Sequence, residues 1–248
     1  MNKLYFFFLI LIIVFIVFIV FKNNNILTIK KHSYLNNTLH YSISGFETSY
    51  GVGVNNSGDI FIPDFKLGYI FKIKKNLKDI SVLDLKNEKL EPLTFYNKFI
   101  YLTILKKIIK KPGNFNRIHD IYFDQQDNMH VIDMGIGNNK GQGLLYIFDK
   151  NLNLIKKLGV NSHYKKGLIS PVMSSTDKNY IYISEWGASK IIIYDKKFIY
   201  HGWLGSFDKI TKEVKSDYWT KDKQISNLSL NSPHAIRFDE YTNIYIVD

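Results

Sequence analysis

Short runs in which hydrophobic and polar residues alternate recur along most of this chain. The segment PHAIRFDEYTNIYIVD (233–248) holds one such run, a polar turn and a second run that ends in an acid. Because successive side chains of a strand point to opposite faces, this alternation predicts β-strands, and the Asp and Asn residues between the runs favour a hairpin turn. The segment is therefore expected to form an antiparallel hairpin.

The same frame occurs four times. IHDIYFDQQDNMHVID aligns with the segment above without a gap and pairs His119 with His234, whereas PVMSSTDKNYIYISE fits with one residue fewer. In chain order, the copies are 49–64, 118–133, 171–185 and 233–248. Each copy ends in an acidic residue, and these closing acids are Asp64, Asp133, Glu185 and Asp248.

Further alternating runs follow the first three copies. Third strands are expected at 69–73, 144–149 and 190–195, and fourth strands at segments such as 152–159 and 197–205. Four antiparallel strands per repeat, without helical segments between them, predict an all-β fold, a β-propeller of four-stranded blades. A single blade cannot bury both of its faces, whereas stacked blades can.

The fourth copy stops after two strands. We therefore expect C-terminal blades to be missing from this chain, with closure of the ring by a partner chain as the alternative.

The copies resemble the NHL-repeat family of propellers. YIYISEWGASKIIIYD (180–195) follows that family's pattern, with Lys190 where Arg is usual, and KPGNFNRIHDIYFD (111–124) is similar to the linker and first strand of such a blade, with Ile118 in place of Pro. The resemblance begins near residue 49 and is weakest over 85–110 and 206–229, which look like insertions. It implies about six blades in the complete ring, and it does not imply an activity, because a fold does not carry function.

The N-terminus carries an uncharged apolar segment, LYFFFLILIIVFIVFIVF (4–21). As a helix it would reach about 27 Å, close to the ~30 Å of bilayer hydrocarbon. We expect residues 1–22 to form an uncleaved signal anchor with one transmembrane helix, with a cleaved signal peptide as the alternative. A polar tether (23–40) and the partial propeller (41–248) follow, and the propeller is expected outside the cytoplasm, in a periplasmic or extracellular location.

The net charge of +11 comes from 33 Lys and Arg residues against 22 acids. Only Arg117 and Arg237 are arginines, and the lysines are scattered between strands, so the charge favours a solvated surface and no nucleic-acid partner. The chain has no cysteine, which excludes disulfides and thiolate metal sites.

The two aligned histidines are the best candidates for chemistry. His119 and His234 begin the first strand of their copies, where residues from separate blades converge at the mouth of a central channel, and two imidazoles there can ligate a divalent metal such as zinc or calcium. FNRIH (115–119) and LNSPH (230–234) resemble the zinc-binding context of the peptidyl-hydroxyglycine amidating lyase propellers. The aligned positions in the other copies hold Val172 and Tyr50 instead. The alternative is a structural role, with each imidazole hydrogen-bonded to nearby backbone.

Other side chains can converge at the same mouth. The acids can line a channel or bind Ca²⁺, although acceptance of turn N–H groups is the favoured reading. The two arginines lie near the two histidines in sequence and can favour an anionic ligand group. The candidate ligand-binding residues are therefore Arg117, Arg237, Asp133, Glu185, Trp186 and Asp64.

No Ser/His/Asp or Cys/His catalytic set can be assembled from the sequence. We expect a membrane-tethered, extracytoplasmic propeller that binds a protein, peptide or glycan on one face without catalysis. One alternative is a metal-dependent propeller enzyme that uses His119 and His234, either a lyase or a lactonase-like hydrolase. Another is an interaction scaffold that faces the cytoplasm.

Overall fold

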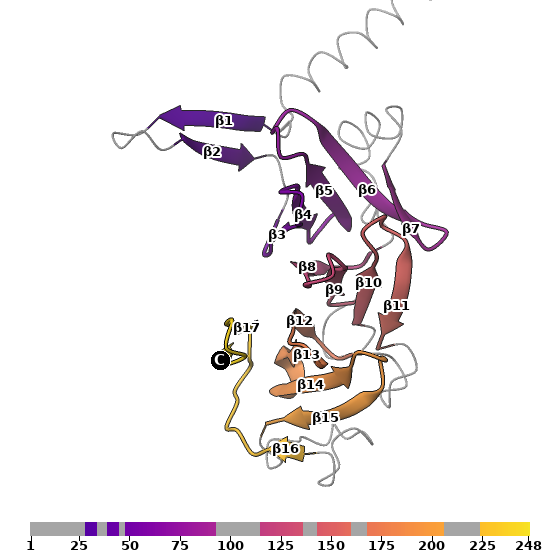
Figure 1. Ribbon diagram of the computed structural model, residues 1–248, viewed down its shortest axis with the longest axis vertical. Helices are drawn as coiled ribbons and strands as arrows, with labels where there is room; N and C mark the ends of the chain where they lie inside the picture. Colours follow the sequence, from indigo (N-terminus) through magenta and orange to yellow (C-terminus); the bar gives the residue numbers. More distant parts are fainter. Residues whose placement is uncertain are drawn as a thin grey trace, which may run out of the picture. The chain divides into compact units, whose positions relative to one another are not determined.

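The computed structural model describes residues 28–33, 39–44, 48–92, 115–135, 143–159, 168–205 and 224–248. The chain divides into two units, and one of them contains a single described hairpin (Figure 1). Its strands, β1 (Thr28–Ser33) and β2 (Leu39–Ser44), pair in antiparallel fashion. Part of this hairpin falls in the segment interpreted as a polar tether (23–40). No strand was predicted for this segment from the sequence, and residues that favour strands, such as Thr28, Ile29 and Ile43, lie in the hairpin.

Among the described residues, the second unit contains four sheets, each built from consecutive strands, and every strand pairing is antiparallel except that of β16 with β15. The first blade contains β3 (Gly53–Val54), β4 (Ile60–Asp64), β5 (Tyr69–Ile73), β6 (Ile80–Lys86) and β7 (Lys89–Pro92). The second blade contains β8 (Ile118–Phe123), β9 (Met129–Asp133), β10 (Leu144–Phe148) and β11 (Leu154–Leu158). The third blade contains β12 (Pro171–Thr176), β13 (Tyr180–Glu185), β14 (Lys190–Asp195), β15 (Tyr200–Leu204) and β16 (Gln224–Ser226). The fourth blade contains β17 (Ala235–Phe238) and β18 (Ile244–Val247).

The expected strand pattern is confirmed in these sheets. Each repeated copy forms the first two strands of a blade, and the predicted third strands coincide with β5, β10 and β14. Two features were not predicted. Residues near the first expected insertion form the β6–β7 hairpin, and β16, inside the second, pairs parallel to β15, where the rest of the sheet is antiparallel (Figure 1).

Apolar residues from neighbouring blades form the core. Buried side chains of the first blade, such as Phe61 and Leu83, pack against Ile121 and Val131 of the second. A separate cluster joins the second and third blades around the fully buried Trp203. Inner strands contact one another from blade to blade, β3 with β8, β8 with β12 and β12 with β17. Neighbouring sheets thus pack against one another through buried side chains, as blade stacking requires, although Tyr245 and Val247 of β18 are exposed.

A turn of one design recurs between strands. In the second blade, Asp124 accepts hydrogen bonds from the backbone N–H groups of Gln126 and Asn128 and from the Asn128 side-chain amide. The third residue after the Asp, Asp127, has a left-handed φ of 64°. Asp149 accepts the same hydrogen bonds from Asn151 and Asn153, and Asp239 accepts them from Tyr241 and Asn243. These Asp-x-x-x-Asn segments are the polar turns seen in the sequence.

The part of the chain described here contains one helical element, the 3₁₀ turn η2 (Trp186–Ala188) that follows β13. No helix among these residues is long and apolar enough to cross a membrane. The apolar segment 4–21 lies outside the described residues, so the expected anchor stays a prediction.

Candidate functional site

The closing acids of the first three blades are fully buried. Asp133 accepts backbone hydrogen bonds from Asn116, Arg117 and Gly135 at 2.8–2.9 Å. Asp64 accepts the N–H groups of Lys66 and Leu67. The carboxylates are therefore directed at backbone of their own blade, which is the structural role that the sequence favoured, and their prediction as ligand-binding groups stays untested.

In several blades, the closing acid accepts a hydrogen bond from the backbone just before the first strand, and we call this contact the latch. Asp133 binds the N–H of Asn116, Glu185 that of Ile169, and the exposed Asp248 that of Asn231. The residue after the acid completes the latch, because Trp186 donates its N–H to the carbonyl of Ser170. This latch places the residues on either side of it at one common end of the blades.

Glu185 differs from the other closing acids in its electrostatics. Burial raises the pKa of its carboxyl group to about 8, against the lowering effect of the Ile169 and Ser170 N–H groups. Its Oε2 accepts these N–H groups, whereas its buried Oε1 has no hydrogen-bond partner within the described residues. Glu185 is therefore a buried acid that gains a proton near neutral pH.

His119 lies on β8 at the latch end of the second blade, at a β-bulge between Ile118 and Asp120. Its ring stacks on Tyr50 of the first blade with ring centroids 4.9 Å apart and an interplanar angle of 6°. Burial lowers the pKa of His119, a hydrogen bond to the Val172 backbone opposes this, and His234 lowers it further. The imidazole is therefore neutral at neutral pH.

His234 lies just before β17 at the equivalent position of the fourth blade and is exposed. Its Nδ1 lies 3.0 Å from the carbonyl oxygen of Ser232, and its ring centroid is 6.2 Å from that of Trp186. Because His234 acts on the pKa of His119, the two imidazoles that sequence alignment paired are also neighbours in space. Their role as metal ligands stays a prediction.

Two more side chains belong to this group. Phe65 contacts Tyr50 edge-on at 5.0 Å, and the Arg117 guanidinium lies over the Phe65 ring at 5.7 Å. We define the aromatic–histidine cluster as Tyr50, Phe65, Arg117, His119, Trp186 and His234. Tyr50 and Trp186 are exposed, with 61% and 41% of their surface accessible.

Sequence reasoning did not single out Phe65. A signal for it existed, because Phe65 follows the closing acid Asp64 as Trp186 follows Glu185. The position after the closing acid is therefore a second place from which a blade can present a ring at this end.

Arg237 does not join the cluster through any described contact. Its guanidinium lies over the Tyr122 ring at 5.7 Å, and its Nη2 is 3.9 Å from Oδ2 of Asp120. Asp120 is buried, and burial raises its pKa to about 6, although Arg237 lowers it in part. The two arginines that the sequence grouped thus contact different partners, Phe65 for Arg117 and Asp120 with Tyr122 for Arg237.

The cluster supplies two of the ligands that a catalytic zinc site needs. Such sites use three protein ligands and one open position. Within the ranges described above, no group of three or more His, Asp or Glu side chains is arranged to hold a metal. His119 and His234 are therefore an incomplete donor set in this part of the chain.

No protein-family model matches the sequence, and no curated protein matches it. Among solved structures, the chain is similar to virginiamycin B lyase from Staphylococcus aureus, with 11% identity and a TM-score of 0.50 over 88% of this chain and 55% of that chain. It is also similar to an auxiliary nutrient binding protein from Bacteroides thetaiotaomicron, with 12% identity and a TM-score of 0.50 over 85% of this chain and 47% of that chain.

At these identities the likeness shows the fold alone, an all-β propeller. The chain spans about half the length of these two proteins. The resemblance to amidating lyases and the number of blades stay predictions.

Proposed function

We propose that the protein is a binding propeller that takes an acidic peptide with aromatic side chains on the aromatic–histidine cluster. The observation that carries this proposal is the stack of Tyr50 on His119, which fixes an exposed ring where the first and second blades meet. Rings that are held rigid and partly exposed are typical anchors of protein ligands, since they bury much area at little entropic cost.

The charges of the cluster favour a peptide over a glycan. Arg117 contributes a cation, and the nearby carboxylates of Asp64 and Asp133 are buried against backbone N–H groups. A glycan can also stack on the rings and accept a hydrogen bond from Arg117, but its neutral hydroxyl groups gain no attraction between opposite charges. An acidic peptide instead gains a charge-assisted hydrogen bond to Arg117 and stacking on the rings.

Binding by the purified full chain tests this proposal. The probe is a short acetylated peptide of alternating tyrosine and glutamate, compared with one of alternating alanine and glutamate and with a neutral cello-oligosaccharide. We expect the tyrosine peptide to bind best, and Tyr50→Ala and Trp186→Ala each to weaken it by about ten-fold or more. Tyr241→Ala, which removes an exposed ring at the turn between β17 and β18, is the matched control and keeps full affinity.

Equal binding by wild type and by both cluster variants would refute the proposal. Preference for the oligosaccharide would leave a glycan as the ligand class.

A metal-dependent lyase or hydrolase is the second candidate. It is favoured by a neutral His119 whose buried Nδ1 has no partner among the described residues, next to His234. If zinc or calcium co-purifies with the full-length protein, and His119→Ala with His234→Ala removes it, this candidate gains over the binding module. If the metal content is unchanged by that double substitution, the candidate fails.

The proposal includes a tether. The apolar segment 4–21 supports membrane attachment with the propeller outside the cytoplasm. Protease added to intact cells is then expected to remove the propeller and leave the N-terminal segment in the membrane fraction. Full protection in intact cells, with cleavage after lysis, would instead indicate a scaffold that faces the cytoplasm.

A further inference from the structure

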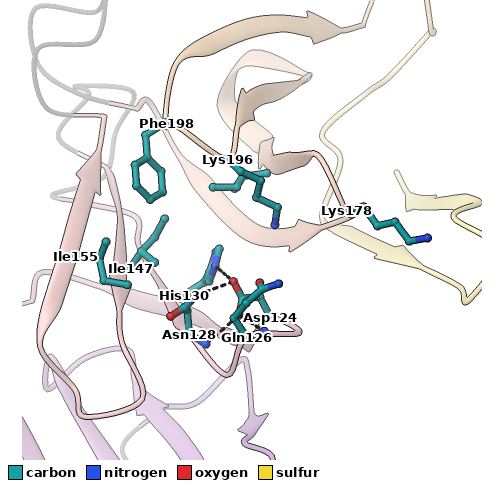
Figure 2. Close-up of a pocket in the computed structure, with 10 residues that line it drawn as sticks. Asp124, Gln126, Asn128, His130, Ile147, Ile155, Lys178, Lys196 and Phe198 are labelled. Atoms are coloured by element: carbon teal, nitrogen blue, oxygen red, sulfur yellow. Dashed lines mark hydrogen bonds and ion pairs between the residues drawn. The ribbon is translucent and has the colours of Figure 1, made fainter.

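A cavity of about 240 Å³ lies between the second and third blades. His119 stands at the start of β8, whereas the cavity residue Asp124 follows the end of that strand, so the cavity belongs to the other end of the blades. Figure 2 shows its two parts, a polar part around Asp124 and Lys196 and an apolar part around Phe198 and Ile155. It shares no residue with the aromatic–histidine cluster.

A buried contact between His130 and Asp124 defines the polar wall. The His130 Nε2 lies 3.5 Å from Oδ2 of Asp124, and His130 is almost completely buried. Burial raises the pKa of Asp124, but the hydrogen bonds from His130 and Asn128 outweigh it and leave the pKa below its usual value. Burial also lowers the pKa of His130 more than Asp124 raises it. At neutral pH this wall therefore carries one negative charge, on Asp124.

Lys196 faces this wall from the third blade (Figure 2). It is half-buried, and burial lowers the pKa of its ammonium group although Asp124 and Asp177 oppose this. Within the described residues its Nζ has no ion pair or hydrogen bond, while its backbone N–H bonds to the Asn179 carbonyl. Asp177 is not a lining residue, and its oxygens accept bonds from Asn179, Tyr180 and Tyr182. Lys196 is thus a partly desolvated cation that makes no ion pair with the charged neighbours described here, although Asp124 and Asp177 both act on its pKa.

Lys178 adds a second cation at the exposed edge of the cavity. With two ammonium groups and the Asp124 carboxylate, the lining has a net charge of about +1. A ligand with one negative charge balances this lining. A dianionic phosphate would meet the Asp124 carboxylate at close range and is disfavoured by like-charge repulsion.

The apolar wall receives side chains from both blades. Phe198 of the third blade faces Ile147 and Ile155 of the second (Figure 2). Ile155 is 46% exposed, so the cavity is open to solvent and a ligand can enter beside it. Burial of an apolar body here contributes about 25 cal/mol for each Å² removed from water.

We propose that this cavity binds a small organic monocarboxylate, with its carboxylate on Lys196 and its apolar body between Phe198 and Ile155. The volume equals that of about eight waters at ~30 Å³ each, which suits an acid of about ten non-hydrogen atoms. This site is separate from the proposed peptide site and does not depend on it. Aromatic acids and short aliphatic acids carry the same single negative charge, so both classes fit this description.

Calorimetric titration of the full chain in a neutral detergent tests the proposal, with phenylacetate as the probe. We expect Lys196→Met to weaken phenylacetate at least about ten-fold, because it removes a charge-assisted contact. Lys197→Met, an exposed neighbour, is the matched control and leaves the affinity unchanged. Phenylacetamide and phenyl phosphate should both bind more weakly than phenylacetate.

A second variant keeps the proposal testable if Lys196→Met also destabilises the fold. Ile155→Glu places a carboxylate at the exposed opening of the cavity, where the fold tolerates it, and is expected to abolish binding while the far-ultraviolet circular dichroism stays that of wild type. No detectable binding of phenylacetate, binding of the amide as tight as that of the acid, tighter binding of phenyl phosphate, or full affinity in both variants would each overturn the proposal.

Discussion

Glu185 lies at the end of β13, where a carboxylate can accept backbone N–H groups or face a ligand. In the structure its Oε2 accepts the N–H groups of Ile169 and Ser170, which is the structural role that the sequence favoured. The neighbouring Trp186, by contrast, stays exposed and contacts His234. The chemistry of each residue is thus decided by the direction of its side chain at the blade end, and adjacent residues have opposite roles.

The raised pKa of Glu185 has a consequence for stability. Its pKa in the folded protein, about 8, exceeds its ordinary value of 4.5, so the folded state holds the proton more strongly than the unfolded state. The free energy of unfolding therefore falls as pH rises from about 4.5 to about 8, and we expect a fall of at least about 1 kcal/mol. Asp120, with a pKa of about 6, contributes to this trend mainly below pH 6. Burial lowers the pKa values of His119 and His130, and these groups give an opposite trend near pH 6.5, so the contribution of Glu185 is read from a comparison of wild type with a Glu185 variant.

Urea unfolding at pH 6 and pH 8 measures this effect. Glu185→Gln keeps a carbonyl oxygen for the N–H groups and has no proton to lose, so the change in its stability from pH 6 to pH 8 should be less unfavourable than that of wild type by at least about 1 kcal/mol. Glu240→Gln, an exposed control, should behave as wild type. A fall of equal size in Glu185→Gln would show that another group titrates.

In the second and fourth blades, the hairpin of the first two strands is closed by two devices. The Asp-x-x-x-Asn turn joins the strands at one end, with a left-handed residue such as Thr242 (φ 68°) at its third position after the Asp. At the other end, the closing acid latches the hairpin to the backbone that precedes it. Both devices are local, which explains why a similar segment can be repeated with varied side chains between them.

Removal of the Asp133 carboxylate tests the latch. Asp133→Ala leaves the N–H groups of Asn116, Arg117 and Gly135 without this acceptor in a buried site. Unsatisfied buried donors cost about 1–3 kcal/mol each, so we expect a loss of about 3 kcal/mol or more in urea unfolding. Asp133→Asn, which keeps one acceptor oxygen, should lose less, and Asp239→Ala, at an exposed turn, less again. An Ala variant as stable as the Asn variant would contradict the latch.

Across the second unit, stability depends on how closely neighbouring blades approach. Gly53 of β3 lies against β8, and a Cβ at this position would stand 2.7 Å from Ile121 Cγ2 and 3.0 Å from the Ile121 carbonyl oxygen. Gly51 has a similar contact with Asp120. The first blade can therefore contact the second at this distance only with glycine in its inner strand.

Gly53→Ala is expected to destabilise the propeller by about 1–3 kcal/mol, because the added methyl group overpacks a backbone contact. Val52→Ala, at the exposed position between the two glycines, should change stability by less than about 0.5 kcal/mol. Far-ultraviolet circular dichroism follows all sheets during unfolding, and tryptophan fluorescence follows Trp186 and Trp203 of the third blade together with Trp219, the third tryptophan of the chain.

If the blades unfold together, Gly53→Ala shifts both signals equally. A shift in circular dichroism alone would show that the first blade opens independently, and the absence of any shift would contradict the close approach.

The sequence by itself determined the all-β repeat pattern and the matched places of His119 and His234. Alternation and turn residues determine structure through interactions between residues that are close along the chain, so they can be recognised from the sequence alone. Only the tertiary structure decided that Tyr50 and Phe65 join His119, that Arg237 contacts Asp120, and that a cavity with Lys196 lies at the other blade end. These outcomes depend on contacts between blades, and the spacing of residues along one chain does not encode which side chains of neighbouring sheets meet.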